Sequence, residues 1–179
     1  YYNPKSRWLG NPHVYPLPVY VQIAEPKDND EFYLISGKAT WHQKSATQHN
    51  CYLMEDAIEG GCPYTVIYIN ADRAQNLGIM NGDLVEVECI GPTKKDDSCV
   101  YNEAVIGNKE RARARITEGL HPKAAWAYFA GGHKSRSMLS KARQGITMNW
   151  LVPSSISPYA AGLGKNYSIV RIRKIKEGG

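Results

Sequence analysis

The residues in this sequence best suited to binding chemistry are small groups of hydrogen-bond donors and cations set beside glycines. Ser36-Gly37-Lys38 combines a hydroxyl group, backbone amides next to a residue without a Cβ atom, and a positive charge. Such a group suits an anion, because glycine lets a ligand come close to the backbone N–H groups. The alternative is an ordinary turn at a strand end, with its lysine in solvent.

Further polar residues with the same potential lie in loops along the rest of the chain. His42 and Gln43 each carry a donor and an acceptor, and Asn149 carries an amide that can pair with the edge of a heterocycle. His133 follows two glycines, and Lys165-Asn166 ends a glycine-rich segment that could reach a phosphate. Each also has a plain structural interpretation: a surface histidine, a turn asparagine or the entry to a hairpin.

Catalytic and metal-binding patterns are not recognisable in the sequence. It has no Ser-His-Asp order and no paired carboxylates in a known motif. The cysteines have no zinc or iron–sulfur spacing, so we expect Cys51, Cys62, Cys89 and Cys99 to be small buried hydrophobic residues. No apolar run approaches the roughly 20 residues of a membrane helix, so direct membrane insertion is not expected.

The charge pattern favours an anionic partner or serves solubility alone. The net charge is +5, from 22 basic and 17 acidic residues. Arg111, Arg113 and Arg115 alternate with small apolar residues, which predicts a basic face on one side of a strand. We interpret this face as the solvent side of an edge strand, where charge prevents edge-to-edge pairing. No aromatic residues alternate with the arginines, so a nucleic-acid partner is not expected.

The elements that must position these residues are short strands joined by long loops. Apolar or alternating runs predict strands at residues 32–35, 64–69, 85–89, 111–116, 124–129 and 167–175. Asn70 offers an N-cap to a short helix that Gly78 ends, and another helical turn is predicted near residues 138–143. Residues 38–50 are polar without a period, which indicates a long loop. The chain is predicted to be mainly β, a barrel in preference to a sandwich, with six to seven strands and one or two short helices.

The first part of the chain differs in composition from the rest. Residues 1–31 hold five of the ten prolines and predict an extended lead-in or linker before a domain at residues 32–179. Such a segment cannot form a core of its own. We therefore expect the chain to be a fragment of something larger.

Three motifs follow one another in a fixed order along the chain. The first is Leu34-Ile-Ser-Gly-Lys38 with Trp41-His-Gln43 and Thr47, the second is Asn70-Ala-Asp-Arg-Ala74 with Leu77-Gly-Ile79, Gly82-Asp83, Val85 and Val87, and the third is Gly131-Gly-His133 with Met148-Asn149 and Gly162-Leu-Gly-Lys165. Together they resemble the C-terminal domain of the dimethyl-sulfoxide-reductase superfamily of molybdenum and tungsten oxidoreductases. The first loop is closest to the arsenate, tetrathionate and thiosulfate or polysulfide reductases. Family members often carry His-x-His at His42-Gln43 and Lys at Asn166.

The resemblance implies a double-psi β-barrel that binds molybdopterin guanine dinucleotide. The residues that it assigns to this cofactor are Ser36, Gly37, Lys38, His42, Gln43, Thr47, Gly132, His133, Asn149, Lys165 and Asn166. It implies a part of the catalytic subunit of a molybdenum or tungsten oxidoreductase that reduces an oxyanion or sulfur compound. The partners would be the remainder of that subunit and an iron–sulfur electron-transfer subunit. Other domains hold the metal in this family, so the isolated domain is expected to be inactive.

Two other functions stay open on the sequence alone. A free-standing double-psi barrel acting as a protein-interaction or substrate-recognition module would explain the motif at residues 77–87 but not the loop at 36–47. A small basic barrel that binds single-stranded nucleic acid is the third hypothesis. If the cofactor hypothesis is right, the loops at residues 36–47, 132–133 and 149–166 should converge at one end of the barrel. They should also be mobile, because few apolar residues anchor them.

Overall fold

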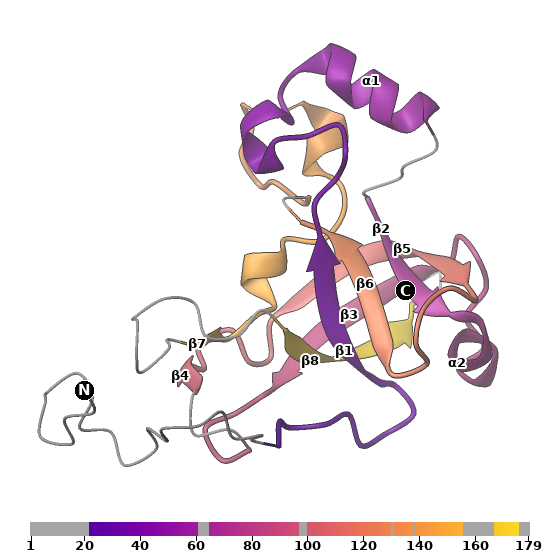
Figure 1. Cartoon of the computed structure of the whole chain (residues 1–179), viewed down its shortest axis with the longest axis vertical. Helices are drawn as coiled ribbons and strands as arrows, with labels where there is room; N and C mark the ends of the chain where they lie inside the picture. The colour runs from indigo at the N-terminus through magenta and orange to yellow at the C-terminus, as the bar shows by residue number, and fades with distance from the viewer. Residues whose placement is uncertain are drawn as a thin grey trace, which may run out of the picture.

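Six strands form a closed barrel, and the other described elements are attached to it (Figure 1). The structure is a computed structural model that describes residues 22–60, 65–96, 100–129, 131–137, 139–155 and 167–175. In ring order the barrel strands are β1 (Glu31–Gly37), β6 (Ala124–Tyr128), β2 (Val66–Asn70), β5 (Lys109–Thr117), β3 (Leu84–Gly91) and β8 (Ser168–Lys174). Outside the barrel lie β4 (Val100–Asn102), β7 (Ser154–Ser155), the helices α1 (Cys51–Glu59) and α2 (Ala71–Asn76), and the 3-10 turns η1 (Lys44–Thr47), η2 (Ser140–Arg143) and η3 (Met148–Trp150). The fold is mainly β, as predicted.

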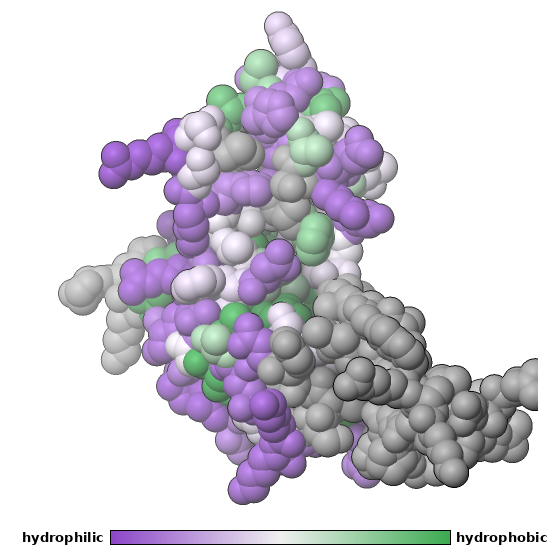
Figure 2. Space-filling view, turned by 90° about the vertical axis from the view of Figure 1, so that its left-hand side faces the viewer, coloured by the Kyte–Doolittle hydropathy of each residue, from purple (hydrophilic) through white to green (hydrophobic). Residues whose placement is uncertain are grey.

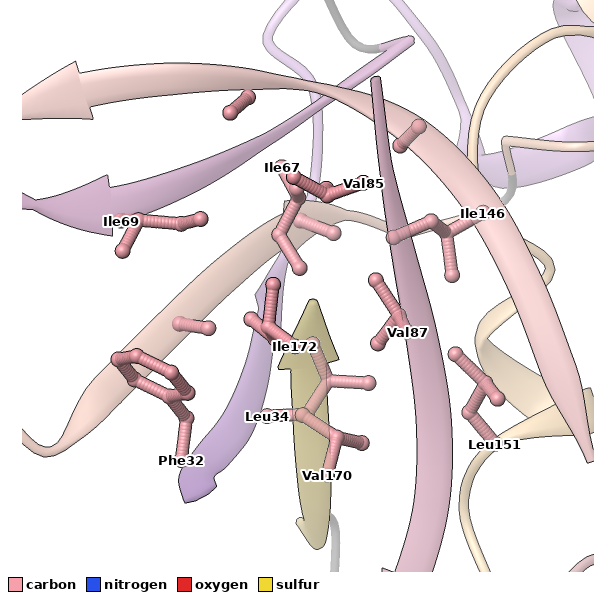
Figure 3. Close-up of a cluster of buried hydrophobic side chains, with 14 of the residues drawn as sticks. Phe32, Leu34, Ile67, Ile69, Val85, Val87, Ile146, Leu151, Val170 and Ile172 are labelled. Carbon is pink, nitrogen blue, oxygen red and sulfur yellow. The ribbon is translucent and has the colours of Figure 1, made fainter. Parts of the chain in front are cut away.

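Alternate residues of each strand fill the interior of the barrel, and Figure 3 shows this cluster. In β3, Val85, Val87 and Cys89 are fully buried, while Leu84, Glu86 and Glu88, which alternate with them, are half-buried. The inward positions of β5 and β6 are mostly alanines. These small residues leave space for larger side chains such as Phe32 and Ile67 at the centre of a narrow barrel.

The cysteines divide between the interior and the surface. Cys89 is fully buried in β3, and burial raises the pKa of its thiol to about 12, so it acts as the expected small hydrophobic residue. Cys51 is exposed at the start of α1, so the expectation of burial is wrong there. Cys62 and Cys99 lie outside the described residues.

The barrel consists of two interlocked copies of one three-strand unit, a repeat that the sequence does not show. Strands β1, β2 and β3 form the first unit, and β5, β6 and β8 form the second. Exchanging the units maps the parallel pair β1–β6 onto the parallel pair β5–β2, and the antiparallel pair β1–β8 onto β5–β3. The antiparallel pairs β2–β6 and β3–β8 each join corresponding strands of the two units. This arrangement is the double-psi β-barrel that the resemblance implied.

The strand directions give the barrel two different ends. Strands β1 and β6 run in the same direction, so the connections after them, residues 38–65 and 129–167, leave from one end, here called the loop end. Strands β2 and β5 run the opposite way, and their short connections, residues 71–83 and 118–123, leave from the other end, the turn end. Figure 1 shows α1 beyond the loop end and α2 at the opposite side of the barrel.

Asn70 ties the two short connections of the turn end to each other. Its side-chain oxygen accepts hydrogen bonds from the N–H groups of Asp72 and Arg73, which caps α2 as predicted. Its amide nitrogen donates to the carbonyl of Leu120 at 2.7 Å. The single asparagine therefore starts the helix after β2 and holds the connection after β5.

Arg73 joins the turn end to the segment that enters β1. Its guanidinium donates to the side chain of Asn29 and to the carbonyls of Asp28 and Glu31, at 3.0–3.1 Å. It also lies 5.1 Å from the centre of the Phe32 ring. Glu31, which falls in the predicted lead-in, is the first residue of β1.

The long loop predicted at residues 38–50 contains the turn η1 and leads into a helix that the sequence pattern did not indicate. The side chain of Asn50 accepts hydrogen bonds from the N–H groups of Tyr52 and Leu53, and so caps α1. The helix buries only Met54 and Ala57, so it lacks the wide apolar stripe that would reveal it in the sequence. None of the helices in the described part of the chain is long and apolar enough to span a membrane.

The edge-strand interpretation of the arginine stripe is wrong. Strand β5 pairs with β2 on one side and with β3 on the other, so it has no free edge. The alternation itself is confirmed, because Arg111, Arg113 and Arg115 are exposed and Ala112 and Ala114 are buried. The charges of this stripe therefore need another explanation.

Candidate functional site

The end of β1 is fixed by close packing around Gly37. A Cβ atom on Gly37 would lie 2.7 Å from the ring of Trp126, so the glycine makes room for an aromatic side chain. Its carbonyl accepts a hydrogen bond from the N–H of Phe129, which joins the exits of β1 and β6. Ser36 is half-buried, whereas Lys38 is exposed and forms no ion pair with any described residue. The glycine thus serves packing on one side, and the serine and lysine are available for binding.

Thr47 organises the loop that carries His42 and Gln43. Its hydroxyl oxygen lies 3.2 Å from Nδ1 of His42 and accepts a hydrogen bond of 2.9 Å from the N–H of Gln43. His42 is buried, and burial lowers the pKa of its imidazole below the ordinary value of 6.5. The ring is therefore neutral at neutral pH. Gln43 is exposed, so its amide faces solvent.

A small apolar cluster fixes α1 above the loop end. Met54 and Ala57 of α1 are buried against Trp41 and Tyr128, which come from the loop after β1 and from the end of β6. A Cβ atom on Gly60 would lie 2.9 Å from the Trp41 ring. The histidine loop is thereby held between α1 and the barrel.

Gly132 fixes the loop that carries His133. It has a φ of +71°, and a Cβ atom there would lie 2.6–2.8 Å from backbone atoms of residues 145–147. Its N–H donates to the carbonyl of Gln144, and its carbonyl accepts a hydrogen bond of 2.6 Å from the hydroxyl of Thr147. Glycine is required here both by the backbone angle and by the contact.

The segment after Gly132 is anchored by apolar side chains. Ile146, Met148 and Leu151 are buried in the barrel core, and Figure 3 shows Ile146 and Leu151 beside Val87. Of the loops expected to have few apolar anchors, the one at residues 149–166 has Leu151 fully buried near its start, so the expectation is wrong for this part of it. The anchors hold Asn149, which is exposed, in a fixed place.

One cavity joins the first and third motifs. It has a volume of about 100 Å³ and lies at the loop end, lined by Ser36, Phe129, Asn149 and Pro153 among others. A space of this size would hold only one edge of a large ligand. Ser36 and Asn149, which are far apart in the sequence, are thus brought together. His42 and Gly132-His133 lie at the same end without lining this cavity, and Lys165 and Asn166 lie outside the described residues.

Some buried polar atoms at the loop end make no hydrogen bond with the described residues. They include Nε2 of His133 and Oε1 of Gln48, a residue that is 1% exposed. Unsatisfied buried polar atoms are rare in native proteins and call for an explanation such as a ligand. Sequence reasoning missed Gln48, because nothing in the polar run around it signals burial.

The loop end therefore offers hydroxyl, amide, imidazole and ammonium groups on a rigid base. Hydrophilic residues predominate at this end in the face that Figure 2 shows. Within the described part of the chain, no group of three or more His, Cys, Asp or Glu residues is arranged to hold a metal ion. These groups suit recognition of a large polar anion through hydrogen bonds.

Comparison with known proteins links the chain to large reductase subunits, although no protein-family model matches it. It is 27% identical over 144 residues to the thiosulfate reductase molybdopterin-containing subunit PhsA of Salmonella typhimurium, and this match covers 80% of this chain and 16% of that protein. It is 28% identical over 161 residues to the putative dimethyl sulfoxide reductase chain YnfE of Escherichia coli, and this match covers 89% of this chain and 18% of that protein.

A solved structure shares the fold. Acetylene hydratase from Pelobacter acetylenicus superposes with a TM-score of 0.60 at 12% identity, covering 89% of this chain and 21% of that chain. The chain thus spans less than a quarter of the length of each of these three proteins. The resemblance carried by the three sequence motifs is confirmed by the similarity of this chain to a molybdopterin-containing thiosulfate reductase subunit and to a putative dimethyl sulfoxide reductase chain.

Proposed function

We propose that this chain binds molybdopterin guanine dinucleotide as the C-terminal domain of the catalytic subunit of a molybdenum or tungsten oxidoreductase. The reaction would be the reduction of an oxyanion or a sulfur compound. The observation that carries the proposal is the cavity at the loop end that Ser36 and Asn149, from distant parts of the chain, line together. The histidine loops leave from the same end of the barrel, and hydrogen bonds within each loop hold them. The relative named as a molybdopterin-containing thiosulfate reductase subunit supports this choice of ligand.

The residues at the loop end fit such a ligand. Nε2 of His133 and Oε1 of Gln48 are buried polar atoms that a bound heterocycle could satisfy. The amides of Gln43 and Asn149 can pair with the edges of the pterin, since each offers a donor and an acceptor. The ammonium of Lys38, free of ion pairs with the described residues, would lie against the pyrophosphate with the Ser36 hydroxyl.

The supporting residues act by holding these groups in place. Thr47 orients His42 and Gln43 through its hydroxyl oxygen, and the packing of Gly37 on Trp126 fixes the turn that carries Ser36 and Lys38. The neutral imidazole of His42 can donate or accept a hydrogen bond without adding charge. When bound, the cofactor would supply the redox metal, and this chain would bind it, orient it and exclude water from one side.

The proposal includes the surroundings of the chain. Residues 1–31 would be an extended lead-in and residues 32–179 the binding domain, and the remainder of the subunit would hold the metal. An iron–sulfur subunit would deliver electrons. The isolated chain is expected to fold and to show no turnover with any electron donor, and turnover by the purified chain alone would contradict this.

The experiment measures cofactor content instead of activity. The complete protein containing this chain is purified from cells that make the cofactor, and guanine nucleotide released by acid hydrolysis is quantified. Lys38→Ala and Asn149→Ala should each lower the cofactor content at limiting supply by about tenfold, since each removes a hydrogen bond to a charged or heterocyclic group. Lys123→Ala and Asn76→Ala, exposed residues of the turn end, are the matched controls and should change nothing.

The outcomes separate the two classes of function. Cofactor loss confined to the loop-end variants supports the proposal. Wild-type protein without guanine nucleotide would overturn it and leave a free-standing interaction module as the function of the barrel.

A further inference from the structure

A second cavity lies on the outer wall of the barrel, where the arginine stripe of β5 meets the connection between β6 and β8. Its volume is about 690 Å³, within the range of about 300–1,000 Å³ of ligand pockets. Five basic side chains line it: Lys109, Arg111 and Arg113 from β5, Lys134 from the loop after β6, and Arg143 from η2. It shares no lining residue with the cavity at Ser36 and Asn149. We call it the basic groove.

Only two acidic residues among the described residues line the basic groove, and both are already neutralised. Glu86 lies 2.8 Å from the ammonium of Lys109, and Glu110 lies 2.8 Å from that of Lys134. The Glu110 side chain is 4% exposed, so this pair compensates a buried carboxylate at the rim. The two lysines are therefore engaged within the protein.

The arginines leave an excess of positive charge in the groove. Arg111 and Arg143 are exposed and form no hydrogen bond or ion pair with any described residue. They come from a strand and from a 3-10 turn that are distant in the sequence. Protection of a strand edge does not explain Arg111, because β5 is paired on both sides in a closed barrel. Two guanidinium groups thus line one cavity without a partner among the described residues.

We propose that the basic groove binds a small anion that carries a phosphate or diphosphate group, at a site that shares no lining residue with the cavity at Ser36 and Asn149. The planar fork of a guanidinium pairs with two oxygens of a phosphate, and two such groups can hold one ligand from different sides. A nucleic acid fits less well, since none of the described residues lining the groove is aromatic. An extended acidic peptide also fits less well, because the closed wall offers no strand edge for backbone pairing.

The test is a calorimetric titration of the complete chain with inorganic pyrophosphate at constant ionic strength. Arg111→Gln and Arg143→Gln should each weaken binding by about tenfold, since each removes a charge-assisted pair. Arg115→Gln is the matched control, because Arg115 is exposed on the same face of β5 and does not line the groove. Arg115→Gln should change the affinity for pyrophosphate by less than about twofold, because only a weak, screened electrostatic attraction is lost.

A second arm identifies the source of the phosphate. A nucleoside diphosphate that binds more tightly than pyrophosphate assigns the groove to a nucleotide, and equal affinity assigns it to the inorganic anion. Both support the proposal. It is overturned by the absence of saturable binding, by equal losses in Arg111→Gln and Arg115→Gln, or by binding of poly-glutamate without pyrophosphate. Unfolding curves confirm that the variants fold, and all three replaced side chains are exposed. The Lys38 and Asn149 variants should bind pyrophosphate here normally, so the two proposals can fail separately.

Discussion

The two ends of the barrel are built from equivalent strands but closed in different ways. At the turn end, short connections are fastened by polar side chains whose partners are within the protein, such as Asn70 on Leu120 and Arg73 on the segment entering β1. At the loop end, long connections are fastened by apolar side chains, such as Ile146 and Leu151, and by the packing of glycines. Thr47 and Thr147 also form hydrogen bonds at this end, but Lys38, Gln43 and Asn149 are exposed and available to other partners.

The difference fits the proposed function, in which the loop end binds the ligand and the turn end serves stability alone. The two units of the barrel are related by exchange, so strand pairing alone does not distinguish the ends. Both ends hold buried polar atoms without a hydrogen-bond partner among the described residues: Nε of Arg73 at the turn end, and Nε2 of His133 and Oε1 of Gln48 at the loop end. The Glu31 carboxylate at the turn end accepts hydrogen bonds from three donors. An unsatisfied buried polar group costs about 1–3 kcal/mol, which a ligand bound as proposed would offset at His133 and Gln48.

The largest effect should come from Gly132→Ala at the loop end. The Cβ atom would clash with the backbone of residues 145–147 at 2.6–2.8 Å, and the φ of +71° disfavours any side chain. We expect a loss of about 3 kcal/mol in the free energy of unfolding, measured by urea denaturation, together with loss of cofactor from the complete protein.

A matched glycine at the turn end separates the two causes. Gly78 has a φ of +64°, but a Cβ atom there would meet nothing within 4 Å. Gly78→Ala should therefore cost only the backbone strain, about 1 kcal/mol. Equal costs for the two variants would contradict the argument that close packing at Gly132 closes the loop end.

The next largest effect should come from removing the negative charge of Glu31 at the turn end. Burial raises the pKa of Glu31, but hydrogen bonds from the N–H groups of Lys27 and Asp28 and the Arg171 guanidinium outweigh it, so the pKa lies below its ordinary value of 4.5. The carboxylate therefore stabilises the fold above pH 4.5, and this contribution is lost as the pH falls through the folded-state pKa. Glu31→Gln should cost about 2 kcal/mol at pH 7, measured by urea denaturation.

The pH dependence provides the check on Glu31. The difference between wild type and Glu31→Gln should shrink in acid, because the wild-type carboxyl group is then neutral as well. A difference that stays constant between pH 7 and pH 3 would mean that the amide disturbs packing and that the charge pair contributes little.

The strands could be predicted because their signals are local. The alternation of buried and more exposed residues in β3 and β5 can be read from neighbouring residues, and the structure confirms it. The same holds for the helix that Asn70 caps and Gly78 ends. Pairing partners are not local, so the free edge assigned to β5 was wrong and the two interlocked units were invisible. Helix α1 was missed because two buried residues give no periodic pattern.

The candidate site could be predicted only where its residues belong to recognisable motifs. Ser36 and Asn149 were predicted through the resemblance, and the structure places both on one cavity. Gln48 belongs to none of the motifs and to no hydrophobic pattern, so only the packing of the loop end shows that it is buried. The apolar anchors of the loop end, such as Ile146, could not be predicted either, because isolated hydrophobic residues in a polar segment do not show which of them reach the core.

A smaller effect should distinguish the two asparagine caps. Asn70→Ala removes the cap of α2 and the hydrogen bond to Leu120, whereas Asn50→Ala removes only the exposed cap of α1. We expect losses of about 2 and about 1 kcal/mol in the free energy of unfolding. Urea denaturation measures both losses. A larger loss of unfolding free energy in Asn50→Ala than in Asn70→Ala would contradict the assignment of stability to the turn end.

The smallest effect should be an acid sensitivity confined to the loop end. Burial lowers the pKa of His42 below 6.5, so the unfolded chain binds the proton more readily than the folded chain. The free energy of unfolding should therefore fall as the pH drops from 6.5 toward the folded-state pKa, because the buried ring beside Thr47 resists the charge. Urea denaturation at pH 7.5 and pH 5.0 should show this loss in wild type and in His49→Asn, an exposed histidine of the same loop, but a smaller loss in His42→Asn. An equal loss in all three proteins would place the acid sensitivity elsewhere, at the carboxylates of the turn end.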